Sequence, residues 1–239
     1  MAAWTTLARA AAAVLFPPVC VGCGGLVEAS GYRHLCGRCA PAVALIAGGA
    51  GAPAGQPDGP GAGGRPGGEA APDLGQARAA VRLEGPARAL LLELKYRGGR
   101  HVLEDMAEIF RRSPALLAHV RGAALVPVPL HPRKERERGF NQSALLAAVL
   151  AREAGGGTAV AGLLQRVVDT PTQTGLDRDC RRANLKNAFA LASGAVLNAR
   201  LRYLLVDDVF TTGSTLNGCA RVLRGAGSGV PDVATYGHG

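Results

Sequence analysis

Aromatic residues are scarce in this sequence of 239 residues, at 4% of the chain. Proteins that bind single-stranded nucleic acid stack successive bases on aromatic side chains, so a stacking platform of that kind is poorly supplied. The chain has no apolar run long enough to cross a bilayer, which favours a soluble protein. A secretory signal is missing as well: residues 10–16 are apolar, but they follow no basic start and precede no useful cleavage site. We therefore expect a cytoplasmic protein.

The composition divides the chain into three parts. Residues 48–77 consist largely of Gly, Ala and Pro, which cannot bury enough apolar surface to offset the entropy of ordering, so this segment is predicted to be a flexible linker. It separates residues 1–47, a small cysteine-containing module with an N-terminal helix, from a larger domain over residues 78–239. The net charge of +9 favours anionic partners, such as phosphates, nucleotides or nucleic acid.

The stretch LLVDDVFTTGST at residues 204–215 carries the strongest functional signal. Residues 201–206 are predicted to form a buried parallel strand, and Asp207 and Asp208 stand where that strand is expected to end. A loop of hydroxyl-bearing and glycine residues follows, composed of Thr211, Thr212, Gly213, Ser214 and Thr215. A helix is predicted next, with an apolar face made by Leu216, Cys219, Ala220 and Leu223.

This order of elements is typical of a phosphate-binding loop, because backbone N–H groups at a helix N-terminus attract an anion. The loop has no lysine, which excludes a Walker A motif, and a single glycine, which excludes a dinucleotide fingerprint. Carboxylates would repel a phosphate, but they accept hydrogen bonds from a vicinal diol. A sugar phosphate satisfies both halves of the motif. The alternative is an ordinary strand–turn–helix junction with an acidic turn.

Two C-x-x-C pairs lie near the N-terminus, at Cys20 and Cys23 and at Cys36 and Cys39. This spacing is typical of a structural zinc site, in which four thiolates leave no open coordination position. The alternatives are two disulfides, which need an oxidising compartment, or four free thiols. Cys219 is expected to be a small core residue of its helix, and Cys180 has no partner pattern.

Strands and helices alternate in the larger domain, which predicts an α/β class with a mainly parallel sheet. Helices are expected at residues 86–95 and 102–111, a strand at 124–129, and a further helix capped by Asn141 and ended by three glycines from Gly155. The strand at 124–129 is predicted to open into a basic loop that contains Arg133, Lys134, Arg136 and Arg138. Ligands bind at the C-terminal ends of parallel strands, which is where both loops fall.

The chain resembles the ComF family of competence proteins and the related GntX proteins of gluconate utilisation. The resemblance rests on the motifs FPPVCVGCGG, LCGRC, LKYRGG, VPVPLHPRKERERGFNQ, TPTQTGLDRDCRRANLKNAF and LLVDDVFTTGST. It implies a four-cysteine zinc module joined to a type I phosphoribosyltransferase fold. Residues after Gly227 lack the closing strand expected of the family, and Pro231 is expected to interrupt an edge strand.

The resemblance also implies a site for phosphoribosyl pyrophosphate (PRPP), or another phosphorylated ribose, together with Mg²⁺. Asp207 and Asp208 would hold the ribose diol, and residues 211–215 would hold the 5′-phosphate. Residues 129–141, with the four basic residues and Asn141, would form the pyrophosphate loop. Residues 172–187 would form a flexible loop, whose candidate binding residues are Thr172, Gln173, Arg181, Arg182 and Asn184.

Two functions remain open at this stage. One is transfer of the phosphoribosyl group to an acceptor that the sequence does not identify, and no general base for that acceptor is evident. The other is a non-catalytic role in DNA uptake, in which the domain binds nucleotide or single-stranded DNA and contacts proteins of the competence machinery. Only Tyr96, Phe140, Phe189 and Phe210 supply aromatic rings near the motifs.

Overall fold

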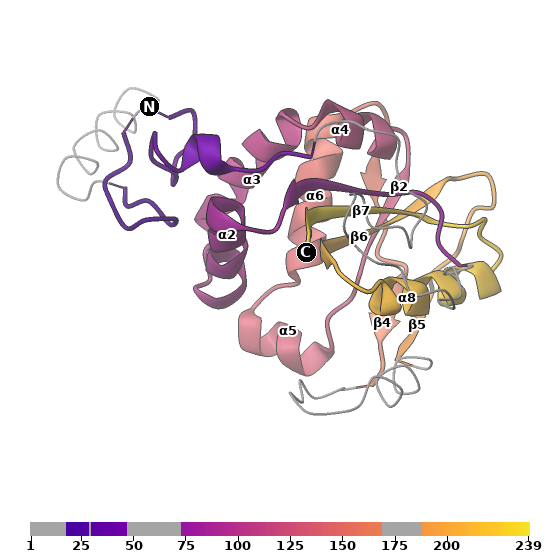
Figure 1. The fold of residues 1–239 in the computed structure, drawn as a ribbon. Helices are drawn as coiled ribbons and strands as arrows, with labels where there is room; N and C mark the ends of the chain where they lie inside the picture. Colours follow the sequence, from indigo (N-terminus) through magenta and orange to yellow (C-terminus); the bar gives the residue numbers. More distant parts are fainter. Residues whose placement is uncertain (1–17, 29, 47–72, 169–187) are drawn as a thin grey trace, which may run out of the picture.

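A parallel sheet of five strands forms the centre of the protein (Figure 1). The computed structural model describes residues 18–28, 30–46, 73–168 and 188–239. The strands run in the order β1-β7-β6-β2-β3, and every neighbouring pair is parallel. Their bounds are Ala77–Arg82 for β1, Asp232–His238 for β7, Tyr203–Phe210 for β6, Ala124–Pro127 for β2 and Ala159–Val160 for β3. The predicted α/β class with a mainly parallel sheet is confirmed.

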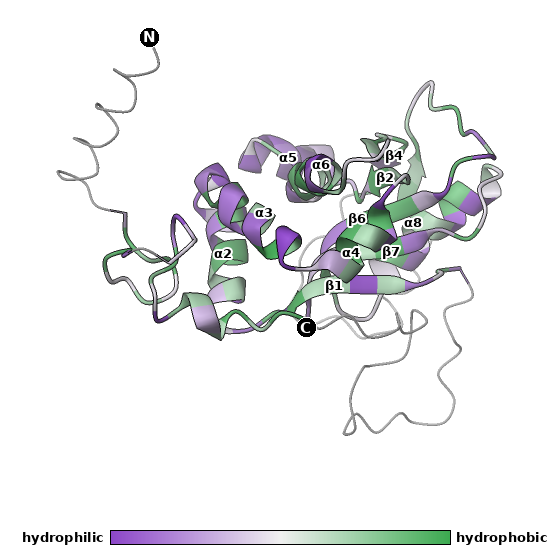
Figure 2. Cartoon of the chain, turned by 90° about the horizontal axis from the view of Figure 1, so that it is seen from above, coloured by the Kyte–Doolittle hydropathy of each residue, from purple (hydrophilic) through white to green (hydrophobic). Residues whose placement is uncertain are grey.

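Helices cover both faces of the sheet. One face packs against α2, α3, α4 and α6, which span Gly85–Tyr96, Leu103–Arg111, Pro114–Val120 and Gln142–Ala154. The other face packs against α8, Ser214–Gly225, and a two-stranded hairpin of β4, Leu164–Arg166, and β5, Phe189–Leu191. Figure 2 shows hydrophobic, green colour at the centre of the sheet around β6, whereas β1 carries hydrophilic bands and the helices α2 and α3 show mixed bands of both colours. None of the described helices has the length and apolar character needed to span a bilayer.

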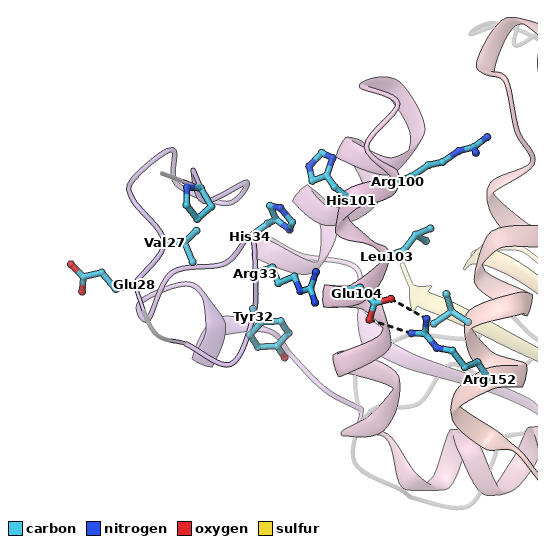
Figure 3. Close-up of a pocket in the computed structure, with 12 residues that line it drawn as sticks. Val27, Glu28, Tyr32, Arg33, His34, Arg100, His101, Leu103, Glu104 and Arg152 are labelled. Atoms are coloured by element: carbon cyan, nitrogen blue, oxygen red, sulfur yellow. Dashed lines mark hydrogen bonds and ion pairs between the residues drawn. The ribbon is translucent and has the colours of Figure 1, made fainter. Parts of the chain in front are cut away.

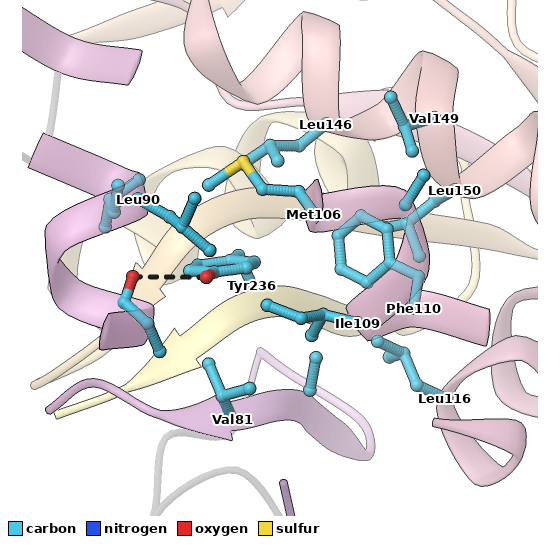
Figure 4. Packing of buried hydrophobic residues seen from close by; sticks show 14 of the residues in the cluster. Val81, Leu90, Met106, Ile109, Phe110, Leu116, Leu146, Val149, Leu150 and Tyr236 are labelled. Carbon is cyan, nitrogen blue, oxygen red and sulfur yellow. Dashed lines mark hydrogen bonds between the residues drawn. The ribbon is translucent and has the colours of Figure 1, made fainter. Parts of the chain in front are cut away.

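The larger core cluster surrounds Tyr236 of β7 (Figure 4). This fully buried ring meets Phe110 of α3 edge to face, with ring centroids 6.2 Å apart. Its hydroxyl donates a hydrogen bond of 3.1 Å to the carbonyl of Ala87, so the one polar atom of the side chain is satisfied. The contact ties the C-terminal strand to α2 and α3.

Strand β7 corrects the expectation that Pro231 interrupts an edge strand. β7 is an inner strand between β1 and β6, and its Val233, Ala234 and Tyr236 are buried. Pro231 lies immediately before the strand, where its missing N–H removes no bond from the ladder. A proline at that position starts the strand without weakening it.

The predicted basic loop is also corrected, because most of it is a helix. α5 spans Pro132–Arg138, begins with proline in its first turn and ends at Gly139, whose φ of 80° is left-handed. An ion pair of 3.0 Å between Arg133 and Glu137, one turn apart, supports this helix. The alternating charges of this segment are therefore arranged on a helix, close to the C-terminal end of β2.

The other predicted elements agree with the structure. The Asn141 side chain accepts a hydrogen bond from the Ser143 N–H and caps α6, which ends at Gly155 with a φ of 57°. The strand expected at residues 201–206 extends further, to Phe210, so Asp207 and Asp208 lie within β6 and not beyond it. The predicted linker mostly falls outside the described residues, and the domain boundaries stay predictions.

Candidate functional site

The junction between β6 and α8 forms the candidate ligand site. After β6 ends at Phe210, Thr211 and Thr212 are exposed, and Gly213 precedes the helix. Gly213 has a φ of 71°, and a Cβ at this position would come within 3.4 Å of the Phe210 ring. The Thr212 and Ser214 hydroxyls lie 2.9 Å apart at the start of α8. The predicted strand, loop and helix are thus present, with hydroxyls beside the unpaired N–H groups of a helix N-terminus.

The two aspartates of β6 have different partners. Asp208 is 6% exposed, and one of its carboxylate oxygens lies 2.9 Å from the ammonium of Lys95 on α2. Asp207 accepts hydrogen bonds of 2.9 Å from the hydroxyl of Ser143 on α6 and from the N–H of Asp208. Side chains of consecutive strand residues point in opposite directions, which explains the separate partners. The acidic pair is therefore anchored by two helices.

Burial, followed by the neighbouring charge of Asp208, raises the pKa of the Asp207 carboxyl to about 7. The hydrogen bonds from Asp208 and Ser143 and the charge of Lys95 act in the opposite direction and are outweighed. Cys219 of α8 is fully buried, and this burial raises the pKa of its thiol well above the usual range. Cys219 is accordingly an inert core residue, as predicted.

Two buried polar atoms beside the acidic pair lack a hydrogen-bond partner among the described residues. They are the hydroxyl of Thr235, which is in register with Asp207, and the amide oxygen of Asn217 in the first turns of α8. Leaving a buried polar atom unpaired costs about 1–3 kcal/mol. Such atoms mark a place where a polar ligand or water can bind.

The four predicted basic residues all lie on α5, and their surroundings differ. Arg133 pairs with Glu137, whereas the Arg138 guanidinium bonds the Gln142 side chain and lies 5.8 Å from the centre of the Tyr96 ring. Arg136 is exposed and Lys134 is half-buried. Asn141 caps α6 and donates to the Val128 carbonyl, so it holds the loop in place.

Sequence reasoning missed two residues of this site. Lys95 comes from the motif LKYRGG and Ser143 directly follows VPVPLHPRKERERGFNQ, so both lie in or beside motifs that had been singled out without a role for them. Their contacts with Asp208 and Asp207 depend on tertiary packing of α2 and α6 against β6. The candidate flexible-loop residues Thr172, Gln173, Arg181, Arg182 and Asn184 lie outside the described residues.

The four predicted cysteines come together in the N-terminal module. The sulfurs of Cys20, Cys23, Cys36 and Cys39 all lie within 4.8 Å of one another, and none forms a disulfide. Cys23 and Cys36 have sulfurs 3.6 Å apart, close to the roughly 3.8 Å between thiolates that share a tetrahedral zinc ion. The cluster could bind zinc.

Tight turns bring each pair of cysteines together. The Gly24 N–H donates to the Cys20 carbonyl, and the Cys39 N–H donates to the Cys36 carbonyl. Hydrogen bonds, led by the one from the Cys39 backbone N–H, outweigh burial and lower the pKa of the Cys36 thiol to about 6, which favours the thiolate that a metal requires. A Cβ on Gly22 would lie 3.1 Å from the Cys39 sulfur, a tight contact that the sulfur could relieve only by moving a few tenths of an ångström.

A buried carboxylate joins this module to α3. Asp105 is 1% exposed and accepts hydrogen bonds from the N–H groups of Arg33 and His34, at 2.7 and 2.9 Å. Its second oxygen lies 2.7 Å from Nδ1 of His34. The module continues into residues 44–46, which pair with β1 through Arg82 and Ala80. It is therefore held at two places on the larger domain.

Together these features define an α/β protein with a candidate anion site at a strand end and a four-cysteine module. No protein-family model matches the chain. Competence protein F of Haemophilus influenzae is 42% identical over 114 residues, 48% of each chain. DNA utilization protein YhgH of Salmonella typhi is 34% identical over 152 residues, 62% of this chain and 65% of that protein.

Competence protein ComFC of Bacillus subtilis is 27% identical over 158 residues, 63% of this chain and 58% of that protein. The matches thus span about half to two thirds of each relative. Together with the motifs and the fold described above, the similarity to these relatives supports the resemblance to the ComF family.

Proposed function

We propose that the junction of β6 and α8 binds PRPP, or a related ribose 5-phosphate, with its phosphate on the loop before α8. The observation that carries the proposal is the combination of Gly213 and its neighbouring hydroxyls with the unpaired atoms of Asn217 and Thr235. An anion at a helix N-terminus gains the N–H groups and the helix dipole. The hydroxyl groups of a ribose would bond the aspartates next to this loop.

Asp207 and Asp208 have unequal parts in this proposal. Asp208 is held by Lys95 and is the fixed acceptor of the pair. Asp207 has a pKa of about 7, and hydrogen bonds donated by a ligand would lower this pKa and favour the ionised carboxylate. If the site transfers the phosphoribosyl group, the two carboxylates would also stabilise positive charge that develops on the ribose ring.

The diphosphate of PRPP needs cations. The basic residues of α5, which follows β2 at the same edge of the sheet, would offset its charge, with Arg136 exposed and able to reach a ligand. Mg²⁺ would be held chiefly by the diphosphate and ribose oxygens and by water, as this ion prefers. Lys95 and Ser143 each engage one oxygen of an aspartate, and an ionised carboxylate can accept further hydrogen bonds, so both aspartates can still bind ribose hydroxyls without ligating Mg²⁺ directly.

We also propose that the four cysteines bind one structural zinc ion. Its binding free energy would order the short module, whose described residues, 18–28 and 30–46, contain little regular structure besides the 3₁₀ turn Ala40–Ala42. Through Asp105, an ordered module would in turn be fixed to α3.

A second candidate function is a role in DNA uptake, which is in keeping with the similarity to competence proteins F and ComFC and to DNA utilization protein YhgH. The basic helix α5 would contact phosphates of single-stranded DNA, and Tyr96, which is 73% exposed beside Arg138, offers one ring for a base. The cysteine module would then be the surface for proteins of the competence machinery. The two functions are compatible if PRPP or a nucleotide regulates DNA handling.

Thermal unfolding in the presence of PRPP and Mg²⁺ tests the first function. PRPP at a hundredfold excess over its dissociation constant adds about 2.7 kcal/mol of stability, and ribose 5-phosphate should give a smaller shift in the same direction. Pyrophosphate alone lacks the ribose and 5′-phosphate, so it is the matched control. An equal shift with pyrophosphate would reject the ribose-phosphate assignment.

A further inference from the structure

A cavity of about 820 Å³ lies between the cysteine module and the larger domain, away from the junction of β6 and α8 (Figure 3). Pro18, Val27 and residues 32–34 form its wall on the module. The opposite wall comes from the turn Arg100–Val102, named η2, and from α3 and α6. Cavities that hold small molecules usually measure 300–1,000 Å³, so this one has a suitable size.

Cationic and imidazole groups gather at this cavity. Arg33 makes no ion pair with any described residue, and Figure 3 shows its side chain extending toward Glu104. Glu104 is already neutralised by Arg152, with oxygen–nitrogen distances of 2.9 and 3.3 Å. Arg100 supplies a further positive charge and is held by the Gly139 carbonyl. Glu28 also lines the cavity, and the hydrogen bond from Arg152, helped by the charge of Arg33, lowers the pKa of Glu104. The lining thus holds three arginines, Arg33, Arg100 and Arg152, against two carboxylates, so an anion entering the cavity would meet a net positive charge.

The wall that carries Arg33 is fixed in position. Asp105 binds the N–H groups of Arg33 and His34 and also the His34 ring, so the backbone at this place has little freedom. The His34 ring meets His101 edge to face, with centroids 4.6 Å apart. The site is thus preorganised, which reduces the entropy lost on binding.

We propose that this cavity binds a small organic phosphate of nucleotide size. The phosphate would accept hydrogen bonds from Arg33, whose planar guanidinium matches phosphate geometry. The base or another apolar part would pack against the imidazole pair and the apolar residues Val27 and Leu103. The cavity shares no residue with the proposed PRPP site, so this proposal does not depend on that function.

Calorimetric titration with deoxyadenosine 5′-monophosphate tests the proposal on the full-length, zinc-loaded chain. We expect saturable binding to the wild type and at least tenfold weaker binding to Arg33→Gln, which loses one charge-assisted hydrogen bond. Arg88→Gln removes an exposed arginine of α2 outside the cavity and should bind like the wild type. Thr212→Val, in the loop before α8, should also bind normally, whereas deoxyadenosine without its phosphate should not bind.

A second variant, Leu103→Trp, fills the apolar side of the cavity and should likewise lose binding. Circular dichroism and zinc content confirm that each variant is folded. The proposal is overturned if the wild type binds no nucleotide at millimolar concentration, or if Arg33→Gln and Leu103→Trp both bind as the wild type does. It is also overturned if Thr212→Val loses binding while Arg33→Gln keeps it, because the nucleotide then occupies the loop before α8.

Discussion

The ammonium of Lys95 lies 2.9 Å from a carboxylate oxygen of Asp208, and both side chains are largely buried. This pair connects the C-terminal end of α2 to the middle strand of the sheet. Removing one partner of a buried pair leaves an uncompensated charge, which costs more than the pair itself contributes. The position of the candidate carboxylate therefore depends on a helix far from it in the sequence.

Lys95→Met should lower the free energy of unfolding by about 3 kcal/mol, because Asp208 remains buried and charged. The double variant Lys95→Met with Asp208→Asn should recover much of that loss. Arg97→Met, which breaks an exposed pair with Glu93, is the control and should cost less than about 1 kcal/mol. Urea denaturation measures these proteins together with the single variant Asp208→Asn, which completes the double-mutant cycle. Losses in the double variant that equal the sum of the two single losses would contradict a direct interaction.

Asp207 should make stability depend on pH. Its pKa is about 7 in the folded chain, against about 3.9 in an unfolded chain, so between these values the folded state holds the extra proton. Its contribution to stability therefore falls as pH rises from about 4 to 7 and is constant above. Asp207→Asn should remove this dependence, so the free energy of unfolding of the variant should rise relative to that of the wild type as pH increases over that range. Denaturation midpoints measured from pH 4.5 to 8 give this pH dependence, and Glu84→Gln, at an exposed position, is the control. Parallel midpoint curves for the wild type and Asp207→Asn would contradict the raised pKa of Asp207.

The cysteine cluster predicts one zinc ion per chain. Cys23→Ser should lose the metal and disorder the module, although Cys23 is exposed and contributes little packing. Cys219→Ala removes a buried cysteine outside the cluster and should keep a full equivalent of zinc. Elemental analysis of protein purified without chelators measures the zinc content per chain in each variant. A wild type free of zinc, or a Cys23→Ser variant with a full equivalent, would exclude the site.

The role of α5 can be measured by the salt dependence of DNA binding. If Arg136 contacts a phosphate of single-stranded DNA, Arg136→Ala should reduce the slope of log affinity against log salt by about 0.7. Arg88→Ala, on the exposed side of α2, should leave the slope unchanged. Fluorescence anisotropy with a labelled oligodeoxynucleotide gives both slopes. Identical slopes for wild type and Arg136→Ala would remove α5 from the DNA interface.

Local patterns in the sequence predicted much of this fold. The cap at Asn141, the end at Gly155 and the apolar face around Cys219 are each encoded within a few residues, so they were confirmed. β7 was missed because burial of Tyr236 in the sheet interior depends on α2 and α3, and the nearby proline suggested an edge. The segment that forms α5 was predicted to be a loop because its residues are almost all charged and give no apolar helix face.

The candidate site was predicted only in part, for a similar reason. Asp207 and the hydroxyl loop stand together in one motif, whereas the partners Lys95 and Ser143 belong to other segments. A contact between distant segments leaves no periodic signal in a single sequence. The cavity beside Arg33 was missed for the same reason, since it exists only where the cysteine module meets α3 and α6.

Calorimetric titration of the zinc-loaded chain with PRPP and Mg²⁺ tests the central claim most directly. The account predicts one saturable site per chain, with about tenfold weaker binding to Thr212→Val, which loses a hydroxyl of the loop before α8. Arg33→Gln, in the separate cavity, should bind PRPP as the wild type does. A folded wild type that shows no saturable heat at millimolar PRPP, or a Thr212→Val variant that binds it equally well, would contradict a ribose-phosphate site at this junction.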